Sequence, residues 1–320
     1  MSIEELKDQL RIFFQNEEGL LAEVYFILKG TEGTYLRMAD IHQDTQKELT
    51  TKFIEKVRDD IINKQELNLI KISDADDRTN VIYEYDLEET PSELNVISDI
   101  IQNDNFPHFS FNQDKLNDLK GFVILISNNG QNLVLYKKHY PVELFRKDSG
   151  FSLTRLGNNQ RFVKLKEDIV RISSYFEFFN FNDTLFINNL NALEKFFGFH
   201  DAIKKRAKIT LDQIKEYGIL ENPDELEEMI DDITYSRKLT KVGNSSPVLG
   251  RIPTNEVINF VENFPGLQGA FEFNDDRSKI KIGTKKSKQM LIKLLNDDYL
   301  HSQLTRQYYD SLAKDAVSTT

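Results

Sequence analysis

The chain has 320 residues, of which 39% are hydrophobic and 29% are charged. Such a composition can bury a substantial core, so it excludes a chain that is disordered throughout. There is no cysteine, which excludes disulfides, thiolate metal sites, cysteine nucleophiles and iron–sulfur clusters, and fits a reducing cytoplasm. The formal net charge is −11, which for the chain as a whole argues against nucleic acid as a partner.

The charge is distributed unevenly along the chain. Residues 1–105 carry 11 Lys and Arg against 24 Asp and Glu, residues 106–232 carry 17 against 19, and residues 233–320 carry 13 against 9. Seven cations and no acid lie between Arg277 and Lys293. The N-terminal segment is therefore acidic and the C-terminal segment mildly basic, so the overall negative charge does not exclude a local basic surface.

The first 105 residues predict an acidic α+β domain. Ser2 and Glu5 form a capping-box pattern in front of a helical stripe of apolar residues. The further expected elements are a hairpin at 20–29 and 34–41, a helix at 44–63, a strand pair at 67–72 and 81–85, and a helix from Pro91 to about 103. The polar, proline-containing stretch at 103–108 is the expected boundary.

Residues 106–320 predict a second, mixed α+β domain. It begins with a hairpin whose turn contains Asn129-Gly130, a strong hairpin signal. The elements expected after it are strands at 151–156, 161–165, 170–181 and 184–188, helices at 190–197, 202–217, 224–233 and 253–264, short strands at 271–273 and 279–282, and helices at 284–295 and 298–314. The fold class is therefore α+β: an N-terminal α/β-hairpin domain, then an antiparallel sheet with a helical C-terminal part.

The final predicted helix rests on apolar spacing. Asp297 or Asp298 is expected to cap it. The residues expected to pack along it are Leu300, Leu304, Tyr308 and Leu312. No apolar stretch in the chain is long enough to predict a membrane span, and the N-terminus has no signal-peptide pattern.

The segment at 279–293 contains the candidate phosphate-binding residues. Thr284 is a plausible N-cap for a helix whose first turn is rich in lysine, although lysine is unfavourable at the positive end of a helix. Free backbone amides together with lysine side chains would suit a phosphate. The candidates are Lys279, Lys281, Lys285, Lys286, Lys288 and Lys293. The alternative is a solvated amphipathic face whose lysines only aid solubility.

A secondary basic patch interleaves cations with aromatic residues. Its cations are Lys137, Lys138, Arg146 and Lys147. Such mixing can stack bases while holding phosphates. The alternative is an ordinary strand end that leads into a loop, and it is favoured because aromatic and basic residues also mix in packed antiparallel sheets.

Enzyme motifs are not found in the sequence. It contains no dinucleotide fingerprint, phosphate-binding loop or nucleophile elbow, and its five histidines include no close pair. No catalytic residue, metal site or cofactor is therefore expected, although scattered carboxylates leave a metal-dependent nuclease open.

Three segments carry a family resemblance: LFINN at 185–189, FFGF at 196–199 and KKSKQMLIKLLNDDYLHSQLT at 285–305. They resemble the KwaB family, the soluble subunit of the bacterial Kiwa anti-phage system, most clearly over about residues 120–315. The resemblance implies a cytoplasmic DNA-binding protein that interferes with phage replication or transcription. It also implies a dimer that assembles with a KwaA-like membrane protein, which would recruit it to the inner membrane without direct insertion.

The sequence and the resemblance together predict a non-catalytic DNA-binding defence effector. The basic segment at 279–293 is the predicted contact surface, and that placement rests on charge. Two alternatives stay open: a metal-dependent nuclease of a defence system, and an interaction adaptor that does not bind DNA.

Overall fold

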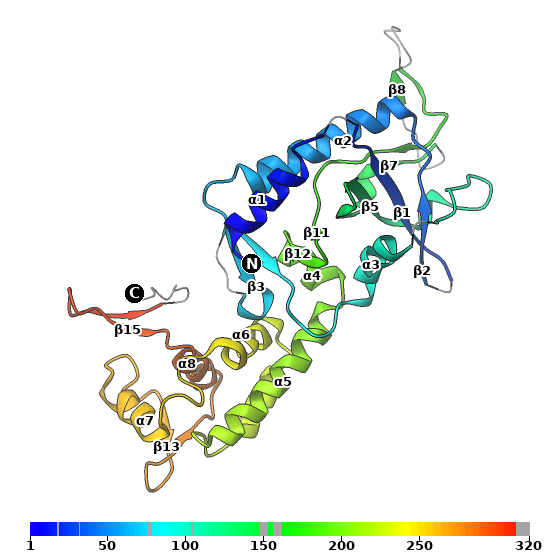
Figure 1. Ribbon diagram of the computed structural model, residues 1–320. Coiled ribbons are helices and arrows are strands. Elements are labelled where there is room, and N and C mark those ends of the chain that lie inside the picture. Colours follow the sequence, from blue (N-terminus) through cyan, green and yellow to red (C-terminus); the bar gives the residue numbers. More distant parts are fainter. Residues whose placement is uncertain are drawn as a thin grey trace. The chain divides into compact units, whose positions relative to one another are not determined.

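The computed structural model describes residues 1–17, 19–31, 33–75, 79–103, 105–147, 153–155 and 162–311 (Figure 1). The chain forms two compact units, each made of two stretches of sequence. The first unit contains Met1–Leu69 and Ser92–Leu193, and the second contains Ile70–Pro91 and Glu194–Thr320. The α+β fold class is confirmed, because both helices and antiparallel strands are present in quantity. The independent folding of residues 1–105 stays a prediction.

The first unit is built on antiparallel strands. The strands of this unit in its main sheet lie in the order β2 (Thr34–Met38), β1 (Ala22–Lys29), β5 (Leu119–Asn128), β6 (Gln131–Lys138), β11 (Phe178–Phe181) and β12 (Thr184–Ile187). Two short ladders accompany it, β7 (Leu144–Phe145) with β10 (Ile169–Val170) and β8 (Leu153–Arg155) with β9 (Phe162–Lys164).

The helices of the first unit are α1 (Ile3–Phe13), α2 (Gln43–Val57) and α3 (Asn95–Gln102). The predicted capping box of α1 is confirmed, since the Glu5 amide donates to Ser2 Oγ at 3.2 Å and the Ser2 amide donates to Glu5 Oε2 at 2.7 Å. A π-helical turn, Arg58–Ile62, ends α2 and packs beside α1 (Figure 1). Strand β3 (Asn68–Lys71) and helix α4 (Leu190–Phe196) lie where the chain passes between the units.

The β5–β6 hairpin has the turn that its sequence predicts. Asn129 and Gly130 have φ values of +49° and +79°, the left-handed backbone of a type I′ turn that Asn-Gly adopts readily. The central residues of both strands are buried, and the buried phenylalanines of β11 lie beside β6, with which β11 pairs. A local turn preference thus positions the centre of the sheet.

The second unit is mainly helical. Its α-helices beyond α4 are α5 (Phe199–Tyr217), α6 (Ile233–Ser245), α7 (Thr254–Asn263) and α8 (Lys285–Leu295). Its strands are β4 (Val81–Glu84), β13 (Glu272–Phe273), β14 (Ile280–Lys281), β15 (Tyr299–His301) and β16 (Tyr308–Asp310). One apolar cluster joins these helices, and it includes the buried face of α8. Within the described residues, no helix combines the length and the apolar character that crossing a bilayer requires.

The predicted helix at 298–314 is wrong. The described part of that segment folds as the antiparallel β15–β16 hairpin, whereas Leu312 and Lys314 lie outside the described residues. Asp297, an expected helix cap, instead has a φ of +57°. This left-handed conformation redirects the chain as α8 ends.

The side chains of this hairpin follow strand rather than helix geometry. Tyr299 points into the core and is 7% exposed, whereas Leu304 lies in the turn and is 93% exposed. His301 and Tyr308 face each other across the two strands, with ring centroids 4.6 Å apart. Cross-strand aromatic contacts therefore replace the packing that a helix would have made along one face.

A second correction concerns the region after Pro223. The helix predicted at 224–233 is a 3₁₀ segment, Pro223–Met229, and the α-helix begins only at Ile233. The Asp232 side chain caps this α6 by accepting hydrogen bonds from the amides of Thr234 and Tyr235. The sequence does not predict α6 because it contains serine, threonine, glycine and asparagine, which are poor helix formers. Its packing against α5 stabilises it instead.

The close approach of α5 and α6 depends on Gly243. A methyl group at this position would lie 2.1 Å from Thr210 Oγ1 and 3.0 Å from Thr210 Cβ. We expect Gly243→Ala to destabilise the protein by about 1–3 kcal/mol through overpacking, although alanine is the better helix former by about 1 kcal/mol. Urea unfolding followed by circular dichroism measures this change.

Gly283→Ala is the matched control, because a methyl group there meets no atom within 4 Å. Its unfolding midpoint is expected to stay near that of the unmodified protein. Equal midpoints for the two variants would contradict the packing argument.

Candidate nucleic-acid interface

Helix α8 forms where the sequence predicts it and presents its first turn to solvent. The Thr284 hydroxyl caps it by accepting the Ser287 amide at 3.0 Å. Lys285 and Lys286 occupy the first turn and are exposed. Their backbone amides lie too early in the helix to have an intrahelical acceptor. The first turn thus combines two ammonium groups with two outward backbone donors.

Lys288 behaves differently from its neighbours, because it lies on the buried face of α8. It is 4% exposed, and its Nζ lies 2.9 Å from Glu225 Oε2 and 3.1 Å from Glu228 Oε2. Burial opposes its charge, but the hydrogen bonds to the two glutamates prevail and raise its pKa. Both acids come from the 3₁₀ segment before α6. Lys288 therefore stabilises the unit and is not available to a phosphate.

Other cations of the 277–293 stretch are also paired with distant acids. Arg277 binds Glu262 at 2.5 Å and Lys293 binds Asp310 at 2.5 Å. A stretch without acids in the sequence is thus not free of acids in space. In the described part of the chain, the cations of this stretch without an ion pair are Lys279, Lys281, Lys285 and Lys286.

Lys279 and Lys281 flank strand residue Ile280 and are half-buried. Ile280 and Ile282 are fully buried, so the two lysines alternate with the core residues. Lys281 lies directly opposite Glu272 in the β13–β14 ladder. These lysines are more shielded than Lys285 and Lys286, which makes the first turn of α8 the most accessible basic feature of the segment.

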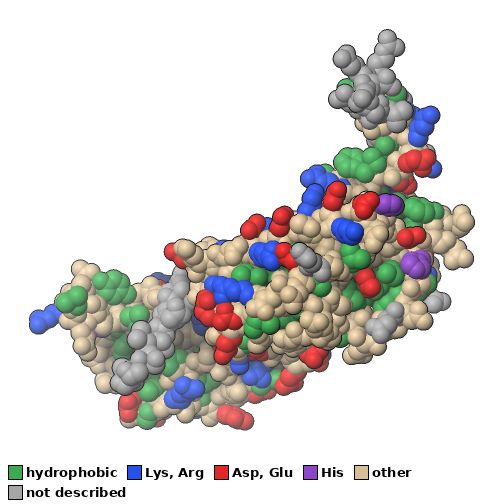
Figure 2. Space-filling model, turned by 45° about the horizontal axis from the view of Figure 1, so that its top comes forward, with side chains coloured by type: hydrophobic (Ala, Val, Ile, Leu, Met, Phe, Trp, Pro, Cys, Tyr) green, Lys and Arg blue, Asp and Glu red, His purple; other side chains and the backbone are tan. Residues whose placement is uncertain are grey.

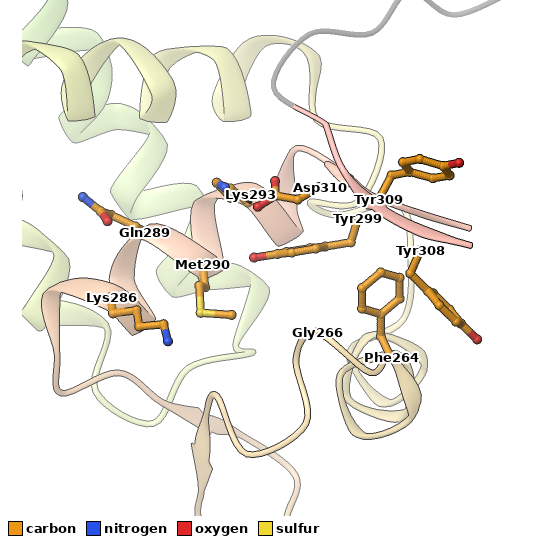
Figure 3. Close-up of a pocket in the computed structure, with 10 residues that line it drawn as sticks. All are labelled: Phe264, Gly266, Lys286, Gln289, Met290, Lys293, Tyr299, Tyr308, Tyr309 and Asp310. Atoms are coloured by element: carbon orange, nitrogen blue, oxygen red, sulfur yellow. Dashed lines mark hydrogen bonds and ion pairs between the residues drawn. The ribbon is translucent and has the colours of Figure 1, made fainter. Parts of the chain in front are cut away.

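A pocket of about 430 Å³ lies between α8 and the β15–β16 hairpin (Figure 3). Helix α8 contributes Lys286, Gln289, Met290 and Lys293 to its wall. The other residues that line it are Phe264, Gly266, Tyr299, Tyr308, Tyr309 and Asp310. The pocket therefore combines basic, amide and aromatic groups.

Tyr299 crosses this pocket, and its hydroxyl points toward α8 (Figure 3). Burial, followed by the nearby charges of Asp310 and Asp298, raises its pKa to about 12. The phenol is therefore protonated at neutral pH and can donate a hydrogen bond. The sequence does not reveal the aromatic part of this site, because its apolar spacing predicts a helix at 298–314 and nothing in the spacing links Phe264 to that segment.

The secondary patch lies in the first unit, and its members have different environments. Arg146 and Lys147 are exposed, and Arg146 Nη1 donates to Asn117 Oδ1 at 2.8 Å. Lys138 is half-buried with its Nζ over the Tyr140 ring. Lys137 is 1% exposed, and its Nζ lies 2.6 Å from Glu143 Oε1.

The environment of Lys137 is a buried polar network. Glu143 also accepts the Tyr140 amide at 3.0 Å, and buried Glu177 accepts the Lys138 amide and the Tyr140 hydroxyl. Burial raises the pKa of Glu177, against the effect of these hydrogen bonds. Burial likewise lowers the pKa of His139, which favours its neutral form. Lys137 is therefore held by Glu143 in the interior of the unit and does not reach solvent.

Charge is mixed rather than segregated on the molecular surface shown in Figure 2, where acidic and basic side chains alternate. No group of three or more His, Asp or Glu side chains suited to a metal ion occurs among the residues that the structure describes. On the face that Figure 2 shows, basic side chains therefore form no large patch of a single sign.

Comparison with known proteins shows that the chain is similar to one protein family. Residues 116–305 match the family described as Kiwa protein KwaB-like. The chain is 31% identical over 319 residues to "Kiwa protein KwaB" of Escherichia coli O55:H7 (strain RM12579 / EPEC), with 99% of each chain covered. No solved structure matches it.

The Lys137–Glu143 pair gives a prediction about stability. Glu143→Gln leaves the Lys137 ammonium without its carboxylate in a buried position, so we expect a loss of about 3 kcal/mol. Chemical denaturation measures it. Glu48→Gln on the exposed surface of α2 makes the same chemical change, and we expect it to cost less than about 0.5 kcal/mol. Equal stability of the two variants would show that the buried pair is not needed.

Proposed function

Because the chain belongs to the KwaB family of Kiwa proteins, we propose that it is an effector that binds DNA without catalysis. Family membership gives it a role in Kiwa anti-phage defence. Binding would interfere with replication or transcription of phage DNA by occupying the template. The contact surface would be the lysines of the C-terminal segment, centred on the first turn of α8.

The observation that carries this proposal is the pair Lys285 and Lys286. Each lysine at a helix N-terminus costs about 0.3–1 kcal/mol relative to a site without charge, because the helix dipole is positive there. Neither has an ion-pair partner in the described residues. Their charge therefore contributes nothing visible to stability, whereas phosphate binding at a helix N-terminus would use both the charge and the free amides.

Lys279 and Lys281 would extend this surface along β14. Contacts from lysines to phosphate oxygens supply affinity that does not depend on sequence. Lys293 is committed to Asp310 and Lys288 to two glutamates. The proposed duplex-binding set is therefore smaller than the set of cations in the segment.

We also propose that two copies of the protein form a homodimer. This homodimer would assemble with a KwaA-like membrane protein, which recruits it to the inner membrane. The family implies other subunits of a Kiwa system. Support for self-association comes from Phe145 and Ile169, which face each other in the β7–β10 ladder and are 44% and 45% exposed. Exposed apolar side chains that lie together often mark a protein–protein contact.

The self-association proposal predicts a change in mass on substitution. Phe145→Ser with Ile169→Ser is expected to shift the protein from dimer to monomer in light scattering, because apolar contact area is lost. Phe111→Ser removes another exposed aromatic side chain of the first unit, 83% exposed, and is expected to leave the dimer intact. A dimer that resists the double substitution would rule out this ladder as the interface.

The DNA-binding proposal predicts that Lys285→Glu with Lys286→Glu abolishes most binding to duplex DNA. The slope of log affinity against log salt is expected to fall by about 2, since each lost phosphate contact removes about 0.9. The melting temperature of the variant is expected to be at least that of the unmodified protein, because glutamate is favourable in the first turn of a helix. Fluorescence anisotropy across salt concentrations measures the affinity and its slope.

The control is Lys47→Glu with Lys52→Glu, an equal charge change on exposed lysines of α2. This variant is expected to keep both the affinity and the slope. Unchanged binding by the α8 variant would show that α8 is not part of the interface.

Two other outcomes would favour the alternative functions. If the unmodified protein binds no DNA even at low salt, the interaction adaptor is favoured. If it cleaves plasmid DNA only with magnesium or manganese, the nuclease is favoured.

A further inference from the structure

The pocket beside α8 has two chemically different ends. At one end lies the ammonium of Lys286, and at the other lie the rings of Tyr308 and Phe264, with Tyr299 between them (Figure 3). We propose that this pocket binds an unpaired nucleotide of single-stranded DNA, with the phosphate at Lys286 and the base against the aromatic side chains. This inference rests on the proposed DNA binding and specifies the form of DNA that the site takes.

The aromatic end is arranged so that part of a ring stays available. Phe264 is buried and contacts the Tyr308 ring edge-on, with centroids 4.9 Å apart at 86°. The Tyr308 ring also lies against His301, with centroids 4.6 Å apart at 33°, and Tyr308 is nevertheless 50% exposed. A base can stack on the part of the ring that these two neighbours leave open, a contact that tolerates any base.

The polar groups separate the positions of phosphate and base. Lys286 has no ion-pair partner among the described residues, so its charge is available to a phosphate. Lys293 is already neutralised by Asp310, and the carboxylate of Asp310 repels a second phosphate. That pair presents donors and acceptors suited to the edge of a base, and the protonated Tyr299 hydroxyl adds a donor.

The dimensions of the pocket decide between single-stranded and duplex DNA. About 430 Å³ lies in the range of pockets that hold small ligands. In a duplex the faces of the bases are covered by their neighbours, so they cannot reach a ring in a pocket. A single-stranded segment can turn one base into the pocket while its backbone continues past Lys285.

Fluorescence anisotropy of the full chain with two labelled probes tests this inference. The probes are an oligothymidylate of about ten nucleotides, within the usual site sizes of single-strand binders, and a duplex. Tyr308→Ala is expected to weaken oligothymidylate binding by about tenfold or more, the usual effect of losing one stacked base. Duplex binding is expected to change by less than about twofold, since its lysine–phosphate contacts remain.

Two further variants separate stacking from loss of structure, and a third tests the phosphate contact. Tyr308→Phe keeps the ring and is expected to bind oligothymidylate as the unmodified protein does. Phe111→Ala removes an exposed ring of the first unit and is expected to leave both affinities unchanged. Lys286→Glu is expected to weaken both probes, because the phosphate contact is common to them.

The outcomes distinguish this inference from the proposed function. If the unmodified protein binds neither probe, DNA binding itself fails. If it binds both probes and Tyr308→Ala changes neither affinity, or changes both equally, DNA binding stands and the nucleotide pocket is overturned. If free thymidine monophosphate displaces the oligothymidylate at equal nucleotide concentration, the pocket is a mononucleotide site and the single-strand assignment is overturned.

Discussion

The burial of the apolar face of α8 determines which lysines of the C-terminal segment reach solvent. Leu291, Ile292 and Leu295 of α8 are part of the core of the second unit. Because side chains three and four residues apart share one face of a helix, Lys288 is turned inward together with Leu291 and Ile292. Lys285 and Lys286 are left at the exposed start of the helix. The accessible charge is thus a consequence of apolar packing.

The buried position of Lys288 shows why the charge counted along the sequence differs from the charge on the molecular surface. A buried ammonium is tolerated only with a partner, and Glu225 and Glu228 supply it from about 60 residues away. The partners of Arg277 and Lys293 also come from outside the acid-free run. Counting charges along a chain cannot reveal such partners, since they are brought together only by the tertiary fold.

Elements with a local cause were predictable from the sequence, and elements with a distant cause were not. The Ser2–Glu5 capping box, the Asn129-Gly130 turn and the Thr284 cap each satisfy backbone groups within a few residues. Helix α6 depends instead on its contact with α5 at Gly243. Glycine has a low intrinsic helix propensity, but its lack of a side chain permits the two helices to pack closely. The family segments, likewise, indicate ancestry without locating a binding surface.

The error at the last predicted helix has the same origin and hides half of the candidate site. Leu300, Leu304 and Tyr308 have helical spacing, but the left-handed turn at Asp297 follows α8 directly and starts a hairpin. That hairpin brings Asp310 to Lys293 and Tyr308 to Phe264. The Lys293–Asp310 pair is partly exposed, so it contributes at most about 1 kcal/mol to stability. Its larger effect is electrostatic: it neutralises one positive charge in the pocket and leaves Lys286 as the lysine of the pocket lining without an ion pair among the described residues. The lysine-bearing side of α8 thereby belongs to a pocket with one charged and one aromatic side, which is the arrangement that the proposed nucleotide site requires and that a site for phosphate alone does not.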